Sequence, residues 1–304
     1  MTCKNCKKNP VIELSGREKL CKICFLKYFE RKVRRTIREY SLIERGDRIL
    51  VACSGGKDST AALYLIKKIF PKAKIRAIHI DVGIKGYSEM NLKNLKIFCK
   101  KFKIKLYEYS LRKEFGNSVC YAVDALKEKG IKSNKCAVCG SLRRRLLNKK
   151  ARDLRATKLV TGHNLDDEAQ SIVMNLFKNN IKTMARLGPK TGAVKDRRFV
   201  QRVKPLYFTS EKETILFSKL MSLPVYYGKC PCSESVFRRQ VSNLIDEFEK
   251  RHPGTKNSIV NSFIGVMPLL KDKYKGEIGK CRYCKEPSSK EVCEVCRILK
   301  EIRT

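Results

Sequence analysis

Along this chain, short segments rich in apolar residues alternate with segments in which apolar residues recur every three or four positions. The short segments have the length of strands and occur at residues 48–52, 74–81, 105–109, 158–161 and 223–226. The periodic segments have the spacing of amphipathic helices and occur at residues 30–43, 62–69, 90–102, 141–155 and 166–177. Strands and helices that alternate in this way predict an α/β fold built on a doubly wound parallel sheet.

Cysteine pairs separated by two residues stand near both ends of the chain. They supply two sets of four thiols, Cys3, Cys6, Cys21 and Cys24 in one and Cys281, Cys284, Cys293 and Cys296 in the other. A tetrahedral zinc ion needs two such pairs, so each set predicts one structural Zn²⁺, with redox-active thiols as the alternative. Paired cysteines without an apolar export signal indicate a reducing compartment, and we expect the protein in the cytoplasm.

These features divide the chain into three parts. We expect a first zinc finger at residues 1–29, a nucleotide-binding catalytic domain at 30–255, and a tail with a second zinc finger at 256–304, where the periodicity weakens. No apolar run reaches the ~20 residues that a membrane-spanning helix needs, and we expect no membrane partner.

The chain is strongly basic, because 68 Lys and Arg residues against 30 Asp and Glu residues give a formal net charge of +38. Such a surface attracts polyanions, and nucleic acid is the leading candidate. A merely solvated lysine-rich surface is the alternative. If the helix at 141–155 follows RNA phosphates, the contacts should come from Arg143, Arg144, Lys149 and Arg152.

A glycine-rich loop, Ser54-Gly55-Gly56-Lys57-Asp58-Ser59, joins the first of these strands to the helix that follows it. In this position backbone N–H groups and the helix dipole bind phosphate, and Lys57 adds positive charge. The spacing differs from that of a Walker A loop. An ordinary glycine-rich turn would be the alternative.

The segment from Thr161 to Ala169, TGHNLDDEA, also follows a strand and enters a helix. It should therefore lie at the same carboxyl edge of the sheet, where ligands bind in such folds. The carboxylates of Asp166 and Asp167 could hold Mg²⁺ on phosphates, transfer protons, or simply cap the helix.

A third group of cysteines lies inside the domain. Cys136 and Cys139 form a pair, and Cys230-Pro231-Cys232 follows much later in the chain. Three thiolates leave one coordination position open, which suits a metal or cluster that takes part in chemistry. Buried apolar cysteines or a redox disulfide between Cys136 and Cys139 would give the same spacing.

The ordered set of motifs resembles the tRNA thiolation enzymes of the TtcA/TtuA superfamily, which are PP-loop ATP pyrophosphatases, and specifically the branch with zinc fingers at both ends. The resemblance covers nearly the whole chain, from the first cysteine set through the Ser54–Ser59 loop and the TGHNLDDEA segment to the last set. It implies that ATP contacts Ser54, Gly55, Gly56, Lys57, Asp58, Ser59, His79, Gly162 and Asp167. It also implies that Cys136, Cys139 and Cys230 hold a 4Fe–4S cluster with one open iron. Cys232 has no assigned counterpart.

The implied activity is ATP-dependent 2-thiolation of a tRNA uridine, in which ATP adenylates O2, sulfur replaces it, and AMP and pyrophosphate leave. Lys57, Asp167 and the three cluster cysteines would carry catalysis. The resemblance also implies a homodimer and a sulfur donor, either a ubiquitin-like thiocarboxylate protein or sulfide. Two other functions are considered: a lysidine-type PP-loop tRNA modifier, which leaves the three cysteines unexplained, and a non-catalytic zinc-ribbon RNA-binding protein, which does not need an intact loop.

One position bears on which uridine is modified. The branch that acts on the T-loop has a lysine four residues after the second cluster cysteine, whereas this chain has Arg143, which stays protonated near neutral pH. That branch also often has a histidine where this chain has Cys24. Both differences favour the wobble uridine.

Overall fold

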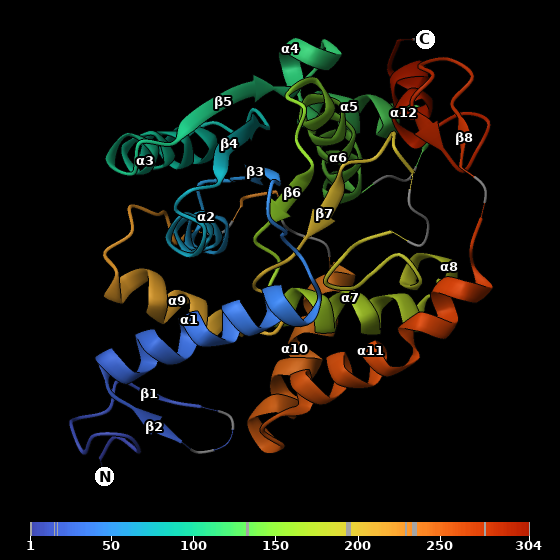
Figure 1. The fold of residues 1–304 in the computed structure, drawn as a ribbon. Helices are drawn as coiled ribbons and strands as arrows, with labels where there is room; N and C mark the ends of the chain where they lie inside the picture. Colours follow the sequence, from blue (N-terminus) through green and yellow to red (C-terminus); the bar gives the residue numbers. More distant parts are fainter. Residues whose placement is uncertain are drawn as a thin grey trace.

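A five-stranded parallel sheet forms the centre of the molecule (Figure 1). The computed structural model describes residues 2–14, 16, 18–131, 134–192, 196–228, 230–232, 236–276 and 278–303. In spatial order the strands are β5 (Lys105–Ser110), β4 (Lys74–Asp81), β3 (Arg48–Ala52), β6 (Lys158–Thr161) and β7 (Gln201–Val203). The prediction of a doubly wound parallel sheet is confirmed.

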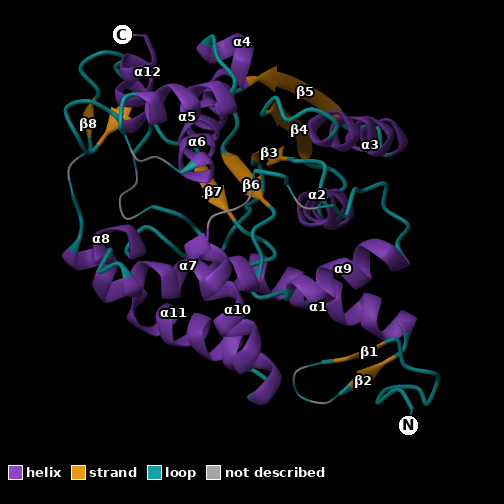
Figure 2. Ribbon diagram, turned by 180° about the vertical axis from the view of Figure 1, so that it is seen from behind, coloured by secondary structure: helices purple, strands orange, loops and turns teal. Residues whose placement is uncertain are grey.

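Helices cover both faces of this sheet (Figure 2). On one face lie α2 (Lys57–Ile69) and α3 (Tyr87–Lys101), with α1 (Lys22–Glu39) and α9 (Glu211–Leu220) packed outside them. On the other lies α6 (Lys135–Asp153), with α4 (Leu111–Phe115), α5 (Val119–Glu128) and α12 (Glu294–Arg303). Strand β3 serves both cores, because Ile49 and Val51 point to the α2 side and Leu50 to the α6 side.

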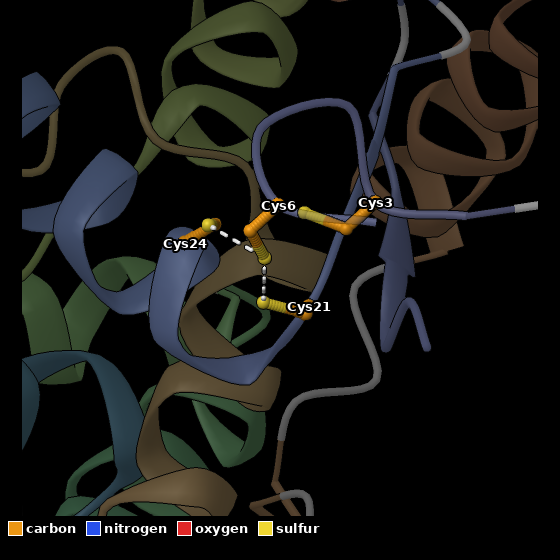
Figure 3. Close-up of side chains that lie close together, drawn as sticks. All are labelled: Cys3, Cys6, Cys21 and Cys24. Carbon is orange, nitrogen blue, oxygen red and sulfur yellow. Dashed lines mark hydrogen bonds between the residues drawn. The ribbon is translucent and has the colours of Figure 1, made fainter. Parts of the chain in front are cut away.

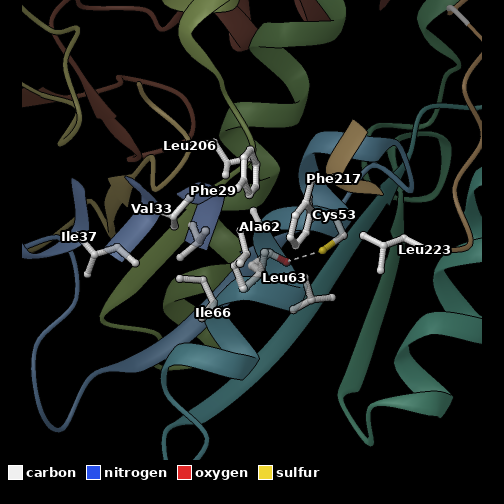
Figure 4. Packing of buried hydrophobic residues seen from close by; sticks show 14 of the residues in the cluster. Phe29, Val33, Ile37, Cys53, Ala62, Leu63, Ile66, Leu206, Phe217 and Leu223 are labelled. Carbon is white, nitrogen blue, oxygen red and sulfur yellow. Dashed lines mark hydrogen bonds between the residues drawn. The ribbon is translucent and has the colours of Figure 1, made fainter. Parts of the chain in front are cut away.

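The larger core contains α1, α2 and α9 (Figure 4). Phe29 of α1 stacks on Phe217 of α9 with ring centroids 4.5 Å apart. The boundary expected between residues 29 and 30 lies inside α1, and Phe25 on its other side is also fully buried in this core. The first cysteine set is therefore attached directly to the main core rather than through a linker.

A further layer consists of α7 (Leu165–Phe177), α8 (Ile181–Met184), α10 (Val236–Arg251) and α11 (Thr255–Lys273). Two small hairpins accompany the terminal cysteines: β1 (Ile12–Glu13) with β2 (Lys19–Leu20), and β8 (Gly279–Lys280) with β9 (Pro287–Ser288). None of the described helices combines the length and apolar character needed to cross a bilayer.

The strand expected at residues 223–226 is wrong, because only Tyr226 makes an isolated bridge there, to Gly56. The fifth strand is β7, which escaped the pattern because it is three residues long and contains Gln201 and Arg202. Helix α11 follows the point where the periodicity was expected to weaken. Val260 and Phe263 are its buried side chains, so its apolar pattern is weak.

Candidate active site

The phosphate loop is folded tightly over the first turn of α2. The Ser54 N–H donates to Oγ of Ser59 at 3.1 Å, and that hydroxyl donates to the Gly56 carbonyl, also at 3.1 Å. Gly55 has φ of +88°, and a Cβ there would lie 2.3 Å from the carbonyl oxygen of Asn91. Position 55 therefore requires glycine, and the loop leaves the N-terminus of a 13-residue helix facing the edge of the sheet.

The loop after β6 touches the phosphate loop directly. A Cβ on Gly162 would lie 2.6 Å from the backbone nitrogen of Ser59. Asn164 caps α7 by accepting from the Asp167 N–H at 3.1 Å, and it donates to Asp58 at 3.0 Å. Strand β3 pairs with β4 on one side and with β6 on the other. The two loops therefore line the crevice at the topological switch point, where the strand order reverses.

Lys57 is held between two carboxylates. Its Nζ lies 3.0 Å from Asp58 and 2.7 Å from Glu211 at the start of α9. Burial lowers the pKa of Lys57, but the negative charges of Asp58 and Glu211 outweigh this and raise it above its usual value. The side chain is therefore a permanent cation at the mouth of the phosphate loop.

The side chain of Asp167 is half-buried and has a cationic partner. Its Oδ1 accepts from the guanidinium of Arg238 at 3.1 Å. Burial raises the pKa of Asp167 to about 6; Arg238 opposes this rise and the nearby Asp58 adds to it. Two carboxylates, Asp58 and Asp167, thus face the same crevice.

The other acidic residues of the TGHNLDDEA segment stabilise the fold. Asp166 accepts the N–H of Glu211 at 2.7 Å and forms an ion pair with Lys256. Glu168 forms a buried ion pair with Lys204 at 2.7 Å. Neither caps α7, because Asn164 does so, and the spacing alone did not distinguish Asp166 from Asp167.

His79 lies beneath the phosphate loop rather than at its surface. Its Nδ1 is 2.9 Å from the carbonyl of Cys53, the residue just before Ser54. Burial lowers the pKa of His79, so the ring is neutral. Its Nε2 is buried and finds no hydrogen-bond partner among the described residues. The contact of His79 is with the backbone that supports the loop.

The three central cysteines lie near the N-terminus of α6. Asn134 caps this helix by accepting the N–H of Cys136 at 2.8 Å. The Cys136 thiol lies 3.4 Å from the Cys232 carbonyl, so the segment that carries Cys230 crosses the first turn of α6. Burial raises the pKa of Cys139; Arg143 opposes this with its charge and a hydrogen bond, whereas Cys230 and Cys136 reinforce it.

The central cysteines are spaced differently from the two terminal sets. Each cysteine of a 4Fe–4S cluster binds a different iron, so cluster ligands stand further apart than the ligands of one metal. Among the described residues, only the two terminal sets bring three or more ligand atoms within 4.8 Å of one another. Cys232, left without a role by the sequence, hydrogen-bonds to Cys120 of α5.

The nucleotide crevice and the three cysteines are neighbours. Tyr226 forms the β-bridge to Gly56 only four positions before Cys230. Arg238 donates to Asp167 and also exerts its positive charge on Cys136, where it lowers the pKa against the dominant effect of burial. Arg238 therefore contacts the nucleotide crevice and also acts through its charge on the central cysteines.

Known proteins share this combination. Residues 26–224 match the PP-loop domain family. The chain is 33% identical over 299 residues to a tRNA-5-methyluridine(54) 2-sulfurtransferase of Pyrococcus horikoshii, an alignment that covers 98% of this chain and 93% of the relative. It is 32% identical to the tRNA 2-thiolation protein NcsA of Haloferax volcanii, and the alignment covers 99% of each. The chain belongs to the PP-loop family of tRNA 2-thiolation proteins.

A solved structure agrees with this family membership. The fold matches that of a U34-tRNA thiolase NcsA from Methanococcus maripaludis, solved with its 4Fe–4S cluster, with a TM-score of 0.84 and 32% identity. The match covers 99% of this chain and 96% of that one. The likeness therefore includes both terminal units and not only the PP-loop domain.

Both terminal cysteine sets converge as the spacing predicted. In the first, the Cys6 sulfur lies 3.4 Å from that of Cys21 and 3.6 Å from that of Cys24 (Figure 3). A hydrogen bond from the backbone of Cys21 is the main cause that lowers the pKa of Cys3 to about 6. In the second set, the Cys293 N–H donates to the Cys281 sulfur at 3.3 Å. Each set of four thiols, supported by backbone N–H groups, could hold a metal ion.

The basic residues expected on α6 do not act as one face. Arg143 turns to Cys139, Arg144 folds back over Gly140, and Lys149 is exposed. Arg152 donates to the carbonyl of Arg198 at 3.0 Å and pairs with Glu286 near the second cysteine set. Arg152 is therefore engaged within the protein, and its assignment to RNA is not supported by these contacts.

Proposed function

We propose that this protein is an ATP-dependent tRNA uridine 2-sulfurtransferase. The observation that carries the proposal is the position of Arg238, which donates to Asp167 in the nucleotide crevice while its charge acts on Cys136. A uracil bound between these groups would have its O2 near the phosphate loop and its C2 near the sulfur site. The family relationship supports the same activity.

ATP activates the base because a carbonyl oxygen is a poor leaving group. The N-terminus of α2 and Lys57 bind the phosphates, and the fixed positive charge of Lys57 stabilises the negative charge that develops as pyrophosphate leaves. Asn164 and Gly162 keep the second loop against the first, so the phosphate position is set before ATP arrives.

Asp58 and Asp167 are the residues that would hold Mg²⁺. Carboxylate oxygens and phosphate are the ligands that this ion prefers, and the negative charge of Asp58 is among the causes that raise the pKa of Asp167 even though Lys57 and Arg238 lie against the two carboxylates. A bound cation would remove this repulsion.

Cys136, Cys139 and Cys230 are the residues that would hold the 4Fe–4S cluster. When bound by only three thiolates, such a cluster supplies an open iron that can carry sulfide. Arg143 donates to Cys139 and offsets the thiolate charge. Since an arginine does not give up its proton near neutral pH, this residue acts here as a fixed countercharge and not as a base.

We favour the wobble uridine as the target. Two positions of the sequence, Arg143 and Cys24, favour it, and the U34-tRNA thiolase of Methanococcus maripaludis has the matching fold. The Pyrococcus relative is named for position 54, so both positions must be tested. The test is anaerobic reconstitution with tRNA transcripts carrying cytidine at position 34 or at position 54, followed by nucleoside mass spectrometry and measurement of AMP. Thiolation lost only with the position-34 change supports the proposal; no AMP and no 2-thiouridine with any tRNA contradict it.

The remaining features of the proposal concern metals, partners and location. We propose that each terminal set holds one Zn²⁺, that the sulfur donor is sulfide or a ubiquitin-like thiocarboxylate protein, and that the enzyme works in the cytoplasm as a homodimer. Exposed apolar side chains on α10 and α11 support a dimer, namely Leu244, Phe248, Val266 and Leu269.

A further inference from the structure

A hollow of about 810 Å³ lies beyond the cluster site, along α6. Its walls come from three parts of the chain: the middle of α6, the edge strand β7 with the segment before it, and the unit that carries the second cysteine set. Figure 1 shows this last unit, with β8 and α12, packed beside α5 and α6. The hollow is thus separate from the crevice that contains Lys57 and Asp167.

The charges that line this hollow do not balance. Among the described residues of the lining, three carry a carboxylate, Asp196, Glu286 and Glu294, and each is already paired with an arginine outside the lining, namely Arg198, Arg152 and Arg297 respectively. Five lining arginines have no ion pair with any carboxylate of the described residues: Arg144, Arg145, Arg186, Arg197 and Arg202. Arg145 instead donates to the sulfur of Cys293. The described part of the lining therefore carries a net positive charge, which favours an anionic ligand.

Arg202 carries one of these positive charges at a partly buried position. It lies half-buried on β7, facing the hollow. Burial lowers the pKa of Arg202 to about 10; the positive charge of Arg144 adds to this shift, and the negative charge of Glu168 opposes it. A phosphate between the guanidinium groups of Arg144 and Arg202 would reduce their mutual repulsion.

An aromatic side chain accompanies the arginines. Phe199 lines the hollow and is 43% exposed, although a large apolar residue near the edge of a sheet is usually covered. Positive charge next to an exposed ring is the combination that binds unpaired nucleic acid, because phosphates pair with arginine and bases stack on the ring. A double helix keeps its bases stacked inside and would not use the ring.

We propose that this hollow binds an unpaired segment of the RNA substrate, with phosphates on Arg144, Arg186 and Arg202 and a base against Phe199. The inference rests on the proposed function for the identity of the RNA. Helix α6 carries both Arg144 and Cys139, so a strand held in the hollow lies next to the sulfur site. The site also gives the second cysteine unit a role, because that unit forms one wall.

The test compares a fluorescent single-stranded oligoribonucleotide with a blunt-ended RNA duplex that has the same number of phosphates. The variant Arg186→Gln/Arg202→Gln should bind the single strand at least about tenfold more weakly than wild type, and the salt slope should fall by about 1.4, or ~0.7 for each lost phosphate contact. The matched control Lys93→Gln/Lys100→Gln removes the same charge from exposed positions on α3 and should cause a much smaller change. Phe199→Ala should weaken single-strand binding without changing the salt slope.

Zinc content and thermal midpoint, measured on every variant, show whether it is folded. Equal losses for the hollow and control variants, or equal losses for single strand and duplex, would overturn the proposal. Its failure can be told apart from failure of the proposed function. If wild type makes 2-thiouridine while the hollow variants bind RNA normally, only the hollow is wrong. If RNA binding depends on the hollow but no uridine is thiolated, only the proposed function is wrong.

Discussion

Gly162 lies so close to Ser59 that a Cβ at position 162 would be 2.6 Å from the Ser59 backbone nitrogen. The two residues follow different strands, β6 and β3, and their contact sets the spacing between the two loops of the nucleotide crevice. A methyl group at position 162 would therefore displace the first turn of α2, where we propose that phosphate binds.

Gly162→Ala should therefore lower the affinity for ATP by about tenfold or more, which corresponds to ~1.4 kcal/mol, and calorimetric titration with ATP measures it. Gly265→Ala in α11 is the matched control, because a Cβ there meets no atom within 4 Å. Unchanged ATP affinity in Gly162→Ala would mean that the two loops do not jointly form the site.

The alternation of strands and helices was sufficient to predict the sheet, because β3, β4 and β6 each have a buried apolar centre. Strand β7 was missed because a short edge strand with polar residues has no apolar signature. The cysteine spacing identified every thiol at both metal sets. The sequence motifs could not reveal Arg238, because it reaches Asp167 from α10, a helix far away in the sequence with no motif of its own. Nor could it show that Arg152 is occupied by Glu286, because such pairs depend on tertiary contacts.

Lys57→Ala should abolish pyrophosphate release while tRNA affinity stays within about twofold of wild type, since Lys57 touches only the phosphate loop and its carboxylates. The exposed Lys72→Ala, just after α2, loses the same charge and should keep full activity. Release of pyrophosphate is measured with a coupled colour assay, and tRNA affinity by filter binding. Normal pyrophosphate release by Lys57→Ala would refute the role of the loop.

The pH dependence should report Asp167. Its pKa is raised to about 6, so the carboxylate forms as pH rises through about 6, and pyrophosphate release should rise with it. Arg238→Gln removes the cation that opposes the raised pKa, so the midpoint of the rate profile should move to higher pH. A midpoint that stays unchanged or moves down would exclude Asp167 as the titrating group.

The raised pKa of Asp167 also makes the folded protein less stable as pH rises. Because the folded-state pKa exceeds that of the unfolded chain, the contribution of Asp167 to stability is present below the unfolded pKa and is lost as pH rises through about 6. Asp167→Asn should therefore melt at a higher temperature than wild type above pH 6, and the difference should shrink towards pH 4. Thermal melting across this range measures it.

Zinc should be bound independently at the two ends. Cys6→Ser and Cys284→Ser should each lower the zinc content from two ions to one per chain, while Cys99→Ala, which removes a buried core thiol, should leave two. Cys284→Ser should also loosen the second unit from α6, because Arg145 donates to Cys293 at 3.3 Å across that contact. Metal analysis after gel filtration gives the stoichiometry, and two ions in either serine variant would contradict it.

Cys139→Ala should remove the iron–sulfur absorbance and with it thiolation, while zinc content and pyrophosphate release persist, because Lys57 and Asp167 lie on other loops. Cys232→Ala is the informative control. Its thiol hydrogen-bonds to Cys120, so this variant should keep both cluster and activity. A rival mechanism would use the central thiols as a persulfide relay, and it predicts full thiolation by iron-free protein supplied with reductant and a sulfur donor. Rates measured before and after anaerobic reconstitution separate the two: activity that appears only with iron supports the cluster, and a colourless preparation working at full rate rules it out.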